Sequence, residues 1–218
     1  IRALLYFASG HVDRATLDID GAREIVDILT PLAKTYGTDM GEEIASLGVQ
    51  VHGGMGYVEE TGAAQFYRDI RIAQIYEGTN GIQAADLVGR KLGLRGGDAI
   101  RDVVARIGQE AGDHAALKAL AGACAEVTEY MLEASIDDRL AGSYPFTTMM
   151  SVAVSGWLMA GQLRAAEAEN DGSNFIKSKI ASCRYYLDVM VPEALSLKGS
   201  AMAGAELLYA LDEDGLSA

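Results

Sequence analysis

Three long apolar stripes in the second half of the chain constrain its fold more than any other feature. Each stripe repeats at alternating steps of three and four residues, which is the period of one face of an α-helix. The stripes run over residues 117–134, 149–166 and 176–197, with turn-forming segments at 142–145 and 170–173 between them. Pro192 is expected to bend or restart the last helix. This pattern predicts antiparallel helices packed as a bundle.

The first half of the chain also has a helical pattern. One helix is expected from Ile1 to about Leu17, and a second begins near Ala22 after a polar break. Pro31 either kinks the second helix or marks a fresh start. The apolar spacing allows one helix through to Val51, or a turn at residues 36–39. With only three prolines among 218 residues, the fold class is predicted to be all-α.

The glycine-rich segment at residues 94–98 is the one plausible linker. We therefore expect two helical units, residues 1–94 and residues 98–218. The first residue is Ile1 rather than Met, and no helix-capping residue precedes the first apolar positions. The chain is expected to be the C-terminal piece of a longer protein, with its first unit truncated.

Composition excludes several classes of partner. The net charge of −13 disfavours a nucleic-acid surface or an anionic membrane surface, which would need clustered Lys and Arg. No apolar run approaches about 18 residues, so we expect no transmembrane helix. Cys124 and Cys183 are far apart on apolar stripes and are expected to be buried free thiols, which fits a reducing, cytoplasmic compartment. No His/Cys cluster suggests a metal site.

One carboxylate stands out at the centre of the motif in residues 75–83. Glu77 follows an apolar stretch and precedes a glycine turn that opens a helix, with Asn80 and Gln83 at the spacing of a capping box. We expect a largely buried approach to deliver Glu77 to a helix N-terminus, where free N–H groups favour negative charge. The alternative is that Glu77 simply helps to cap this helix.

A second feature is the glycine-rich stretch at residues 52–57. Three glycines in four residues are incompatible with a regular helix and permit positive φ. The stretch either brings the backbone close to a ligand or is only a turn. His52 is interpreted as a structural histidine, and Arg68 with Asp69 as a local ion pair.

Taken together, three motifs resemble the C-terminal helical domain of acyl-CoA dehydrogenases: Gln50–Tyr57, Tyr67–Asp69 and Ile75–Thr79. The resemblance extends over residues 1–92. Residues from about 98 to 218 resemble the extra helical domain of longer, bacterial-type members of that family. The resemblance implies an FAD-dependent enzyme that removes the α-proton of an acyl-CoA thioester and passes the β-hydride to flavin N5.

The resemblance also implies roles for individual residues. Glu77 matches the catalytic base, and an apolar pocket would disfavour its charged form and so raise its basicity. Its backbone N–H matches a donor to the thioester oxygen. The remaining expectations are substrate contacts at Tyr76 and Gly78, and FAD contacts at Gln50, Gly53, Gly54 and Thr79, with Gln50 and Gly54 reaching FAD from a neighbouring subunit.

Further expectations follow from the resemblance alone. The electron acceptor is expected to be an electron-transfer flavoprotein, and the protein a homo-oligomer, either a dimer or a tetramer. The isolated chain is expected neither to bind FAD tightly nor to turn over substrate. Three alternatives remain: an acyl-CoA oxidase that passes electrons to O₂, a non-catalytic flavoprotein relative, or an oligomerisation module in residues 98–218, which is compatible with the enzyme.

Overall fold

The computed structural model describes residues 1–169 and 171–217, and within these ranges the chain is helical without any β-strand. The predicted all-α fold class is therefore confirmed. The first part of the chain contains α1 (Arg2–Thr16), α2 (Ala22–His52), α3 (Gly54–Tyr57), η1 (Glu59–Thr61), α4 (Ala63–Arg71), η2 (Ile72–Gln74), α5 (Asn80–Asp86) and η3 (Leu87–Lys91). The segment η4 (Leu94–Gly97) leads into the second part.

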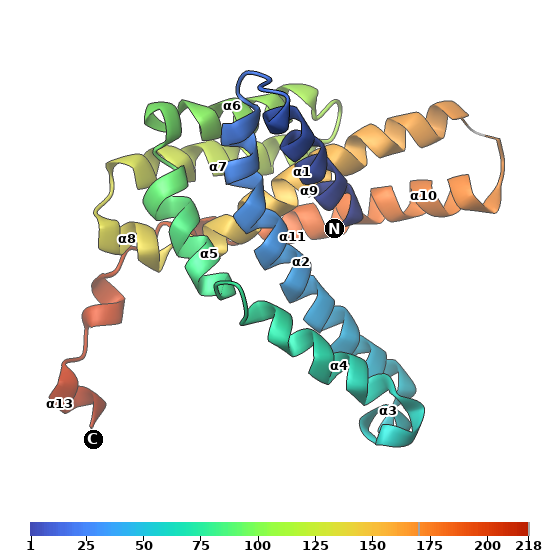
Figure 1. The fold of residues 1–218 in the computed structure, drawn as a ribbon, viewed down its shortest axis with the longest axis horizontal. Coiled ribbons are helices and arrows are strands. Elements are labelled where there is room, and N and C mark those ends of the chain that lie inside the picture. Colours follow the sequence, from blue (N-terminus) through green and yellow to red (C-terminus); the bar gives the residue numbers. More distant parts are fainter. Residues whose placement is uncertain (170, 218) are drawn as a thin grey trace.

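The second part of the chain forms the larger share of the body (Figure 1). It contains α6 (Asp98–Glu110), α7 (Ala115–Glu133), α8 (Ile136–Ala141), α9 (Ser143–Glu169), α10 (Asn174–Tyr185), η5 (Tyr186–Met190), α11 (Val191–Leu195), α12 (Lys198–Ala201), η6 (Glu206–Tyr209) and α13 (Glu213–Leu216). Helices α9 and α10 form a long antiparallel pair, as the apolar stripes predicted.

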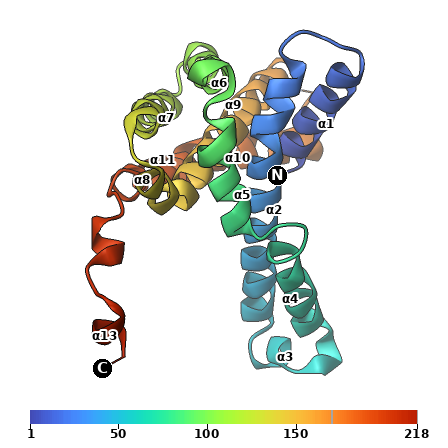
Figure 2. The same ribbon diagram turned by 60° about the vertical axis from the view of Figure 1, so that its left-hand side comes forward.

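Helix α2 is continuous over 31 residues with Pro31 inside it, which settles the question that the sequence left open. All of its buried residues lie in its first half, between Ala22 and Tyr36. Its second half leaves the body and pairs with α4 to form an arm, with α3 at the tip (Figures 1 and 2). The apolar residues Ile44, Leu47 and Val51 of the arm are more than half exposed.

The hydrophobic core joins both parts of the chain. Leu29 and Leu32 of α2 are fully buried in the same cluster as Leu117 of α7 and Phe146 of α9. The two predicted helical units therefore share one core. Their boundary at residues 94–98 stays a prediction, although η4 is irregular there, with φ of 51° at Arg95 and 97° at Gly97.

The first two apolar stripes are buried as predicted, except that Ala134 and Met159 are only partly buried. Along α7 the stripe positions Leu117, Leu120, Cys124, Val127 and Met131 are all fully buried. In the third stripe Ile176, Cys183, Leu187 and Ala194 are buried as predicted, and the π-helical turn η5 brings Tyr186 and Val191 inward beside them. A π turn adds a residue to the helical repeat, and the strict alternation of three and four does not anticipate it. Pro192 lies in the first turn of α11, where the helix restarts as expected.

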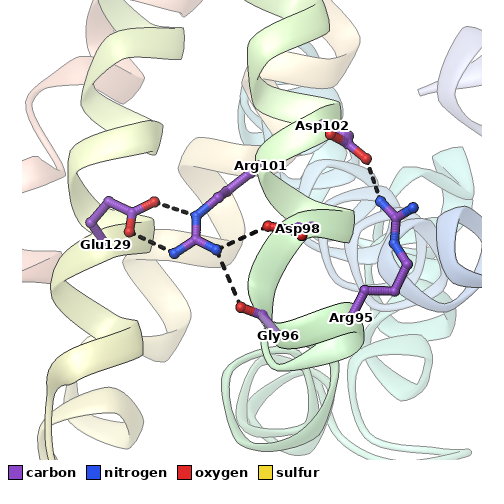
Figure 3. A network of polar contacts seen from close by, with 6 residues as sticks. All are labelled: Arg95, Gly96, Asp98, Arg101, Asp102 and Glu129. Carbon is purple, nitrogen blue, oxygen red and sulfur yellow. Dashed lines mark hydrogen bonds and ion pairs between the residues drawn. The ribbon is translucent and has the colours of Figure 1, made fainter.

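A network of ion pairs holds the segment between the two parts (Figure 3). The Arg101 guanidinium donates to both carboxylate oxygens of Glu129 at 2.7 Å, and to Gly96 O and Asp98 Oδ1 at 3.2 Å each. Arg95 forms a further pair with Asp102. Hydrogen bonding to Arg101 lowers the pKa of Glu129 below its usual range. The network ties η4 to α6 and α7.

Both cysteines are free and buried, as predicted, and burial raises the pKa of Cys124 to about 12. Among the described residues no group of His, Cys, Asp and Glu side chains is arranged to hold a metal ion. None of the described helices combines the length and apolarity needed to cross a membrane.

Alanine substitutions at two glycines are expected to change the stability of the fold in opposite directions. A Cβ at Gly142 would lie 2.1 Å from the backbone oxygen of Ala201, so Gly142→Ala should destabilise the fold by about 1–3 kcal/mol. Gly122, in α7, has open space around it, and Gly122→Ala should stabilise by about 0.5–1 kcal/mol. Thermal unfolding of both variants beside the unmodified protein checks the pair. A Gly142→Ala protein that melts at or above the unmodified protein would contradict the packing of α12 on this turn.

Candidate functional site

Glu77 lies in the turn between η2 and α5, in a strained backbone conformation. Its φ is +52°, and Gly78 follows with φ of +83°. A left-handed conformation at a non-glycine residue costs about 1–2 kcal/mol, so the surrounding contacts must hold it. Such outliers gather at functional sites, which makes this turn the first candidate.

The helix cap lies one residue earlier than the sequence analysis predicted. Thr79 is the N-cap of α5, and its Oγ1 accepts the Ile82 N–H at 3.2 Å. The capping box at Asn80 and Gln83 is therefore wrong. The Gln83 side chain instead reaches back over the turn and donates from Nε2 to the carbonyl oxygen of Glu77 at 3.3 Å. This contact helps to hold the left-handed backbone at Glu77.

Asn80 is buried, with 3% of its surface exposed, and is the centre of a polar cluster on α2. Its Nδ2 donates to Asp39 Oδ1 at 2.7 Å and to Thr38 Oγ1 at 2.9 Å. Its Oδ1 accepts from Lys34 Nζ at 2.6 Å. Asp39 Oδ1 also accepts from Gln74 Nε2 at 2.8 Å. Gln74 and Asn80 are three residues before and after Glu77, so one carboxylate holds both ends of the turn.

The charge on Lys34 is coupled to this cluster. Burial lowers the pKa of its ammonium group from the ordinary value, while the carboxylates of Asp39 and Glu77 act in the opposite direction. Lys34 therefore supplies a positive charge close to both carboxylates, and it compensates for holding Asp39 in a partly buried cluster.

The approach to Glu77 is more exposed than the sequence analysis expected. Ile72, Ile75 and Tyr76 are 58%, 48% and 51% exposed, and Glu77 itself is exposed. The expectation of a largely buried approach is therefore wrong for this chain. The apolar side chains here point outward because α2 covers only one side of η2 and α4. A desolvated environment for Glu77 would have to come from another surface.

The glycine-rich stretch forms the tip of the arm. The chain turns at Gly53, with φ of +61°, and then makes the short helix α3, so only the break at Gly53 departs from helix. Gly56 is required by packing, because a Cβ there would lie 2.2 Å from Val49 O. Gly54 has nothing within 4 Å of its Cβ position, so its small size leaves room for a group outside the chain. An exposed Gln50 precedes this turn.

Two further residues of the arm have structural contacts. His52 donates from Nδ1 to Gly48 O at 2.8 Å, in agreement with its interpretation as a structural histidine. Arg68 pairs with Glu59 at 3.2 Å rather than with Asp69, which corrects the predicted local pair. Residues of α2, α3 and α4 also enclose a groove of about 800 Å³ at this end, lined in part by Val49, Tyr57 and Arg68.

The predicted site residues form two groups within this chain. Tyr76, Glu77, Gly78 and Thr79 lie together at one end of α4, whereas Gln50, Gly53 and Gly54 lie at the other end (Figure 1). Nine residues of α4 separate the groups, about 14 Å of helix. The chain by itself does not bring the two groups to one site.

Comparison with protein families identifies the chain. Residues 1–92 match the family described as acyl-CoA dehydrogenase, C-terminal domain, and residues 98–212 match the one described as acetyl-CoA dehydrogenase C-terminal like. The all-helical architecture of the described residues agrees with both of these C-terminal domain descriptions. The chain belongs to the acyl-CoA dehydrogenase family.

Curated relatives agree with this family. A 3-methylmercaptopropionyl-CoA dehydrogenase of Ruegeria pomeroyi is 37% identical over 213 residues, covering 88% of this chain and 36% of that protein. A butyryl-CoA dehydrogenase of Syntrophomonas wolfei is 28% identical over 216 residues, covering 88% and 35%. A caffeyl-CoA reductase-Etf complex subunit of Acetobacterium woodii is 41% identical over 61 residues, covering 28% and 16%. The chain spans about a third of the length of the first two relatives.

The cluster around Asn80 was not predicted from the sequence. Asp39 was placed in a possible turn at residues 36–39, and Asn80 in a capping box at the start of α5. The signal that these two residues meet was not local, because they are 41 positions apart and lie on different helices. Because the course of the helix past residue 36 was left open, no local pattern indicated that Asp39 faces another helix.

Asn80→Ala should lower the free energy of unfolding by about 1–3 kcal/mol, because it removes the side-chain hydrogen bonds that the buried Asn80 amide makes with Lys34, Thr38 and Asp39. Asn174→Ala, at an exposed position in α10, is the matched control and should change stability by less than about 0.5 kcal/mol. Equilibrium unfolding in urea measures both. Equal effects of the two substitutions would contradict a structural role for Asn80.

Proposed function

We propose that this chain is the C-terminal part of an FAD-dependent acyl-CoA dehydrogenase that introduces a double bond between Cα and Cβ of an acyl-CoA thioester. The observation that carries the proposal is the left-handed Glu77 turn, held by Gln83, Asn80 and Asp39. A fold that only needed a helix cap would obtain it from Thr79 without strain at Glu77. Membership of the family supports the same reaction.

Glu77 is the proposed base that removes the substrate α-proton. The exposed apolar residues Ile72 and Ile75 precede it and provide a surface that an acyl chain or another part of the protein can cover. Covering this surface would desolvate the carboxylate and favour its protonated form, which strengthens it as a base. The backbone N–H of Glu77 is the proposed donor to the thioester oxygen, where negative charge develops. Gly78 leaves space beside the base, and Tyr76 is proposed to line the same site.

FAD, when bound, would accept the hydride from Cβ at N5. The residues proposed to hold it are Gln50, Gly53 and Gly54 at the tip of the arm and Thr79 beside the base. Gly54 fits this role, because the chain itself places nothing against it. Since the tip and the base lie at opposite ends of α4, the tip is proposed to reach the flavin of a neighbouring subunit. The active protein is then a homo-oligomer, a dimer or a tetramer.

An electron-transfer flavoprotein is the proposed electron acceptor, and the similarity to a subunit of a complex named for Etf supports it. The alternative is an acyl-CoA oxidase, which would pass the electrons to O₂ after the same proton and hydride steps. The two buried free thiols support a reducing, cytoplasmic location. We also propose that the helical units defined by the sequence, residues 1–94 and 98–218, correspond to two domains of the full-length protein that pack together through their shared core.

Glu77→Gln in the full-length protein should abolish reduction of the flavin, because an amide cannot accept the α-proton. The measurement is bleaching of the flavin absorbance under anaerobic conditions with a panel of acyl-CoA thioesters. A rate loss of at least about a hundredfold is expected. Glu133→Gln, at an exposed position on α7, is the matched control and should bleach as the wild type does.

Bleaching of Glu77→Gln at the wild-type rate would reduce Glu77 to a residue of a helix turn, and the base would have to lie elsewhere in the protein. Rapid reoxidation of the reduced wild-type enzyme by O₂ would favour the oxidase alternative.

The 218-residue chain alone should not form a tight complex with FAD, because its two groups of flavin-binding residues are separated along α4. Isothermal titration of the purified chain with FAD measures this directly. A submicromolar complex would show that the chain holds a complete flavin site and would refute the proposed division of the site between subunits.

A further inference from the structure

We propose that Tyr144, at the start of α9, is a positioning residue for the Glu77 turn and acts on it through Asp39. The inference rests on the proposed function, because it assigns Tyr144 to the orientation of the base. Tyr144 belongs to the second part of the chain, whereas Glu77 and Asp39 belong to the first.

The contact is a short hydrogen bond between two distant parts of the sequence. The Tyr144 hydroxyl donates to Asp39 Oδ2 at 2.6 Å, across 105 positions. Among the described residues it is the one hydrogen bond to Oδ2 of this carboxylate, since Asn80 and Gln74 both donate to Oδ1. Tyr144 therefore occupies the oxygen that the turn does not use.

This arrangement fixes the rotation of the Asp39 carboxylate. With Oδ2 held by Tyr144, Oδ1 points to the Nδ2 of Asn80 at 2.7 Å and the Nε2 of Gln74 at 2.8 Å. Those two side chains flank Glu77 on both sides. Helices α2, α5 and α9, which carry Asp39, Asn80 and Tyr144, also pack against one another (Figure 2). Without the phenol hydroxyl, Oδ2 loses this donor, and only the two hydrogen bonds to Oδ1 orient the carboxylate that anchors the turn.

Tyr144 stays a donor over the whole physiological range of pH. Partial burial, followed by the hydrogen bond to Asp39, raises the pKa of Tyr144 to about 12. Tyr144→Phe removes this donor and keeps the ring, so it tests the hydrogen bond rather than the packing of α9.

The consequence is that residues 98–218 take part in the chemistry as well as in the core. A module that served only oligomerisation would need no hydrogen bond to Asp39, the residue that anchors the Glu77 turn. The hydrogen bond from Tyr144 to Asp39 lies where the arm leaves the body, close to the start of α5 (Figure 1).

The experiment uses the full-length holoenzyme and stopped-flow flavin reduction under anaerobic conditions, with the thioester that bleaches the wild type fastest. Tyr144→Phe should lower the rate constant per bound FAD by about tenfold, because a small displacement of the base slows proton removal steeply. The KM, the FAD content and the melting temperature should stay close to the wild-type values. Tyr185→Phe, at a tyrosine of α10 that is 63% exposed, is the matched control and should not change the rate.

A double-mutant cycle tests the route through Asp39. In an Asp39→Asn background, Tyr144→Phe should cause little further loss, since residues acting through one another are not additive. Gln74→Leu removes a donor to the same carboxylate and provides a second background if Asp39→Asn yields no holoenzyme. In this background too, Tyr144→Phe should lower the rate constant of flavin reduction by less than it does in the wild-type protein.

Three results would overturn the inference: an unchanged rate per flavin in Tyr144→Phe, a loss that disappears after correction for FAD content, or losses that add fully in the cycle. Glu77→Gln separates this failure from failure of the proposed function. If Glu77→Gln is inactive and Tyr144→Phe is normal, only the role of Tyr144 is wrong. If Glu77→Gln bleaches at the wild-type rate, the proposed base is wrong, and the inference fails with it.

Discussion

The packing of the first half of α2 into the shared core is the contact on which the rest of the structure depends. Leu29 and Leu32 are fully buried there, and the hydroxyls of Tyr36 and Tyr186 meet at 2.9 Å on the same face. Because α2 is one continuous helix, burying its first half also fixes the direction of its second half. The arm, its glycine tip and the α4 helix that carries the chain to Glu77 all take their position from this one buried surface.

A polar cluster occupies the place where α2 leaves the core. Asp39, Asn80 and Lys34 are mutually satisfied by short hydrogen bonds, and a cluster of this kind tolerates few alternative arrangements. Removing these polar groups from water costs free energy, but their hydrogen bonds fix a single conformation of the Glu77 turn. Strain at Glu77 persists because the contacts on both sides of it are fixed to one helix.

The arm has an unusually apolar exterior for the surface of a single chain. Ile44, Leu47, Val51 and Tyr57 are each more than half exposed, and the apolar approach to Glu77 continues this surface. Extended apolar surfaces of this kind mark places where other protein or a ligand binds. If the flavin site is divided between subunits as proposed, a neighbouring subunit would cover this apolar surface. This division also explains why the site residues of one chain lie at both ends of α4.

Local patterns determined much of this protein. The helical class, the buried stripes of α7 and α9, the restart at Pro192 and the family motifs around Glu77 could all be read from neighbouring residues, because helix periodicity and turn chemistry act over a few positions. The tertiary structure alone decided the continuity of α2, the burial of Tyr186 and Val191 at η5, the exposure of Ile75 and the contact between Asn80 and Asp39. Each of these depends on which surface a segment packs against. That choice is made between residues far apart in the chain, and single-sequence periodicity carries no information about it.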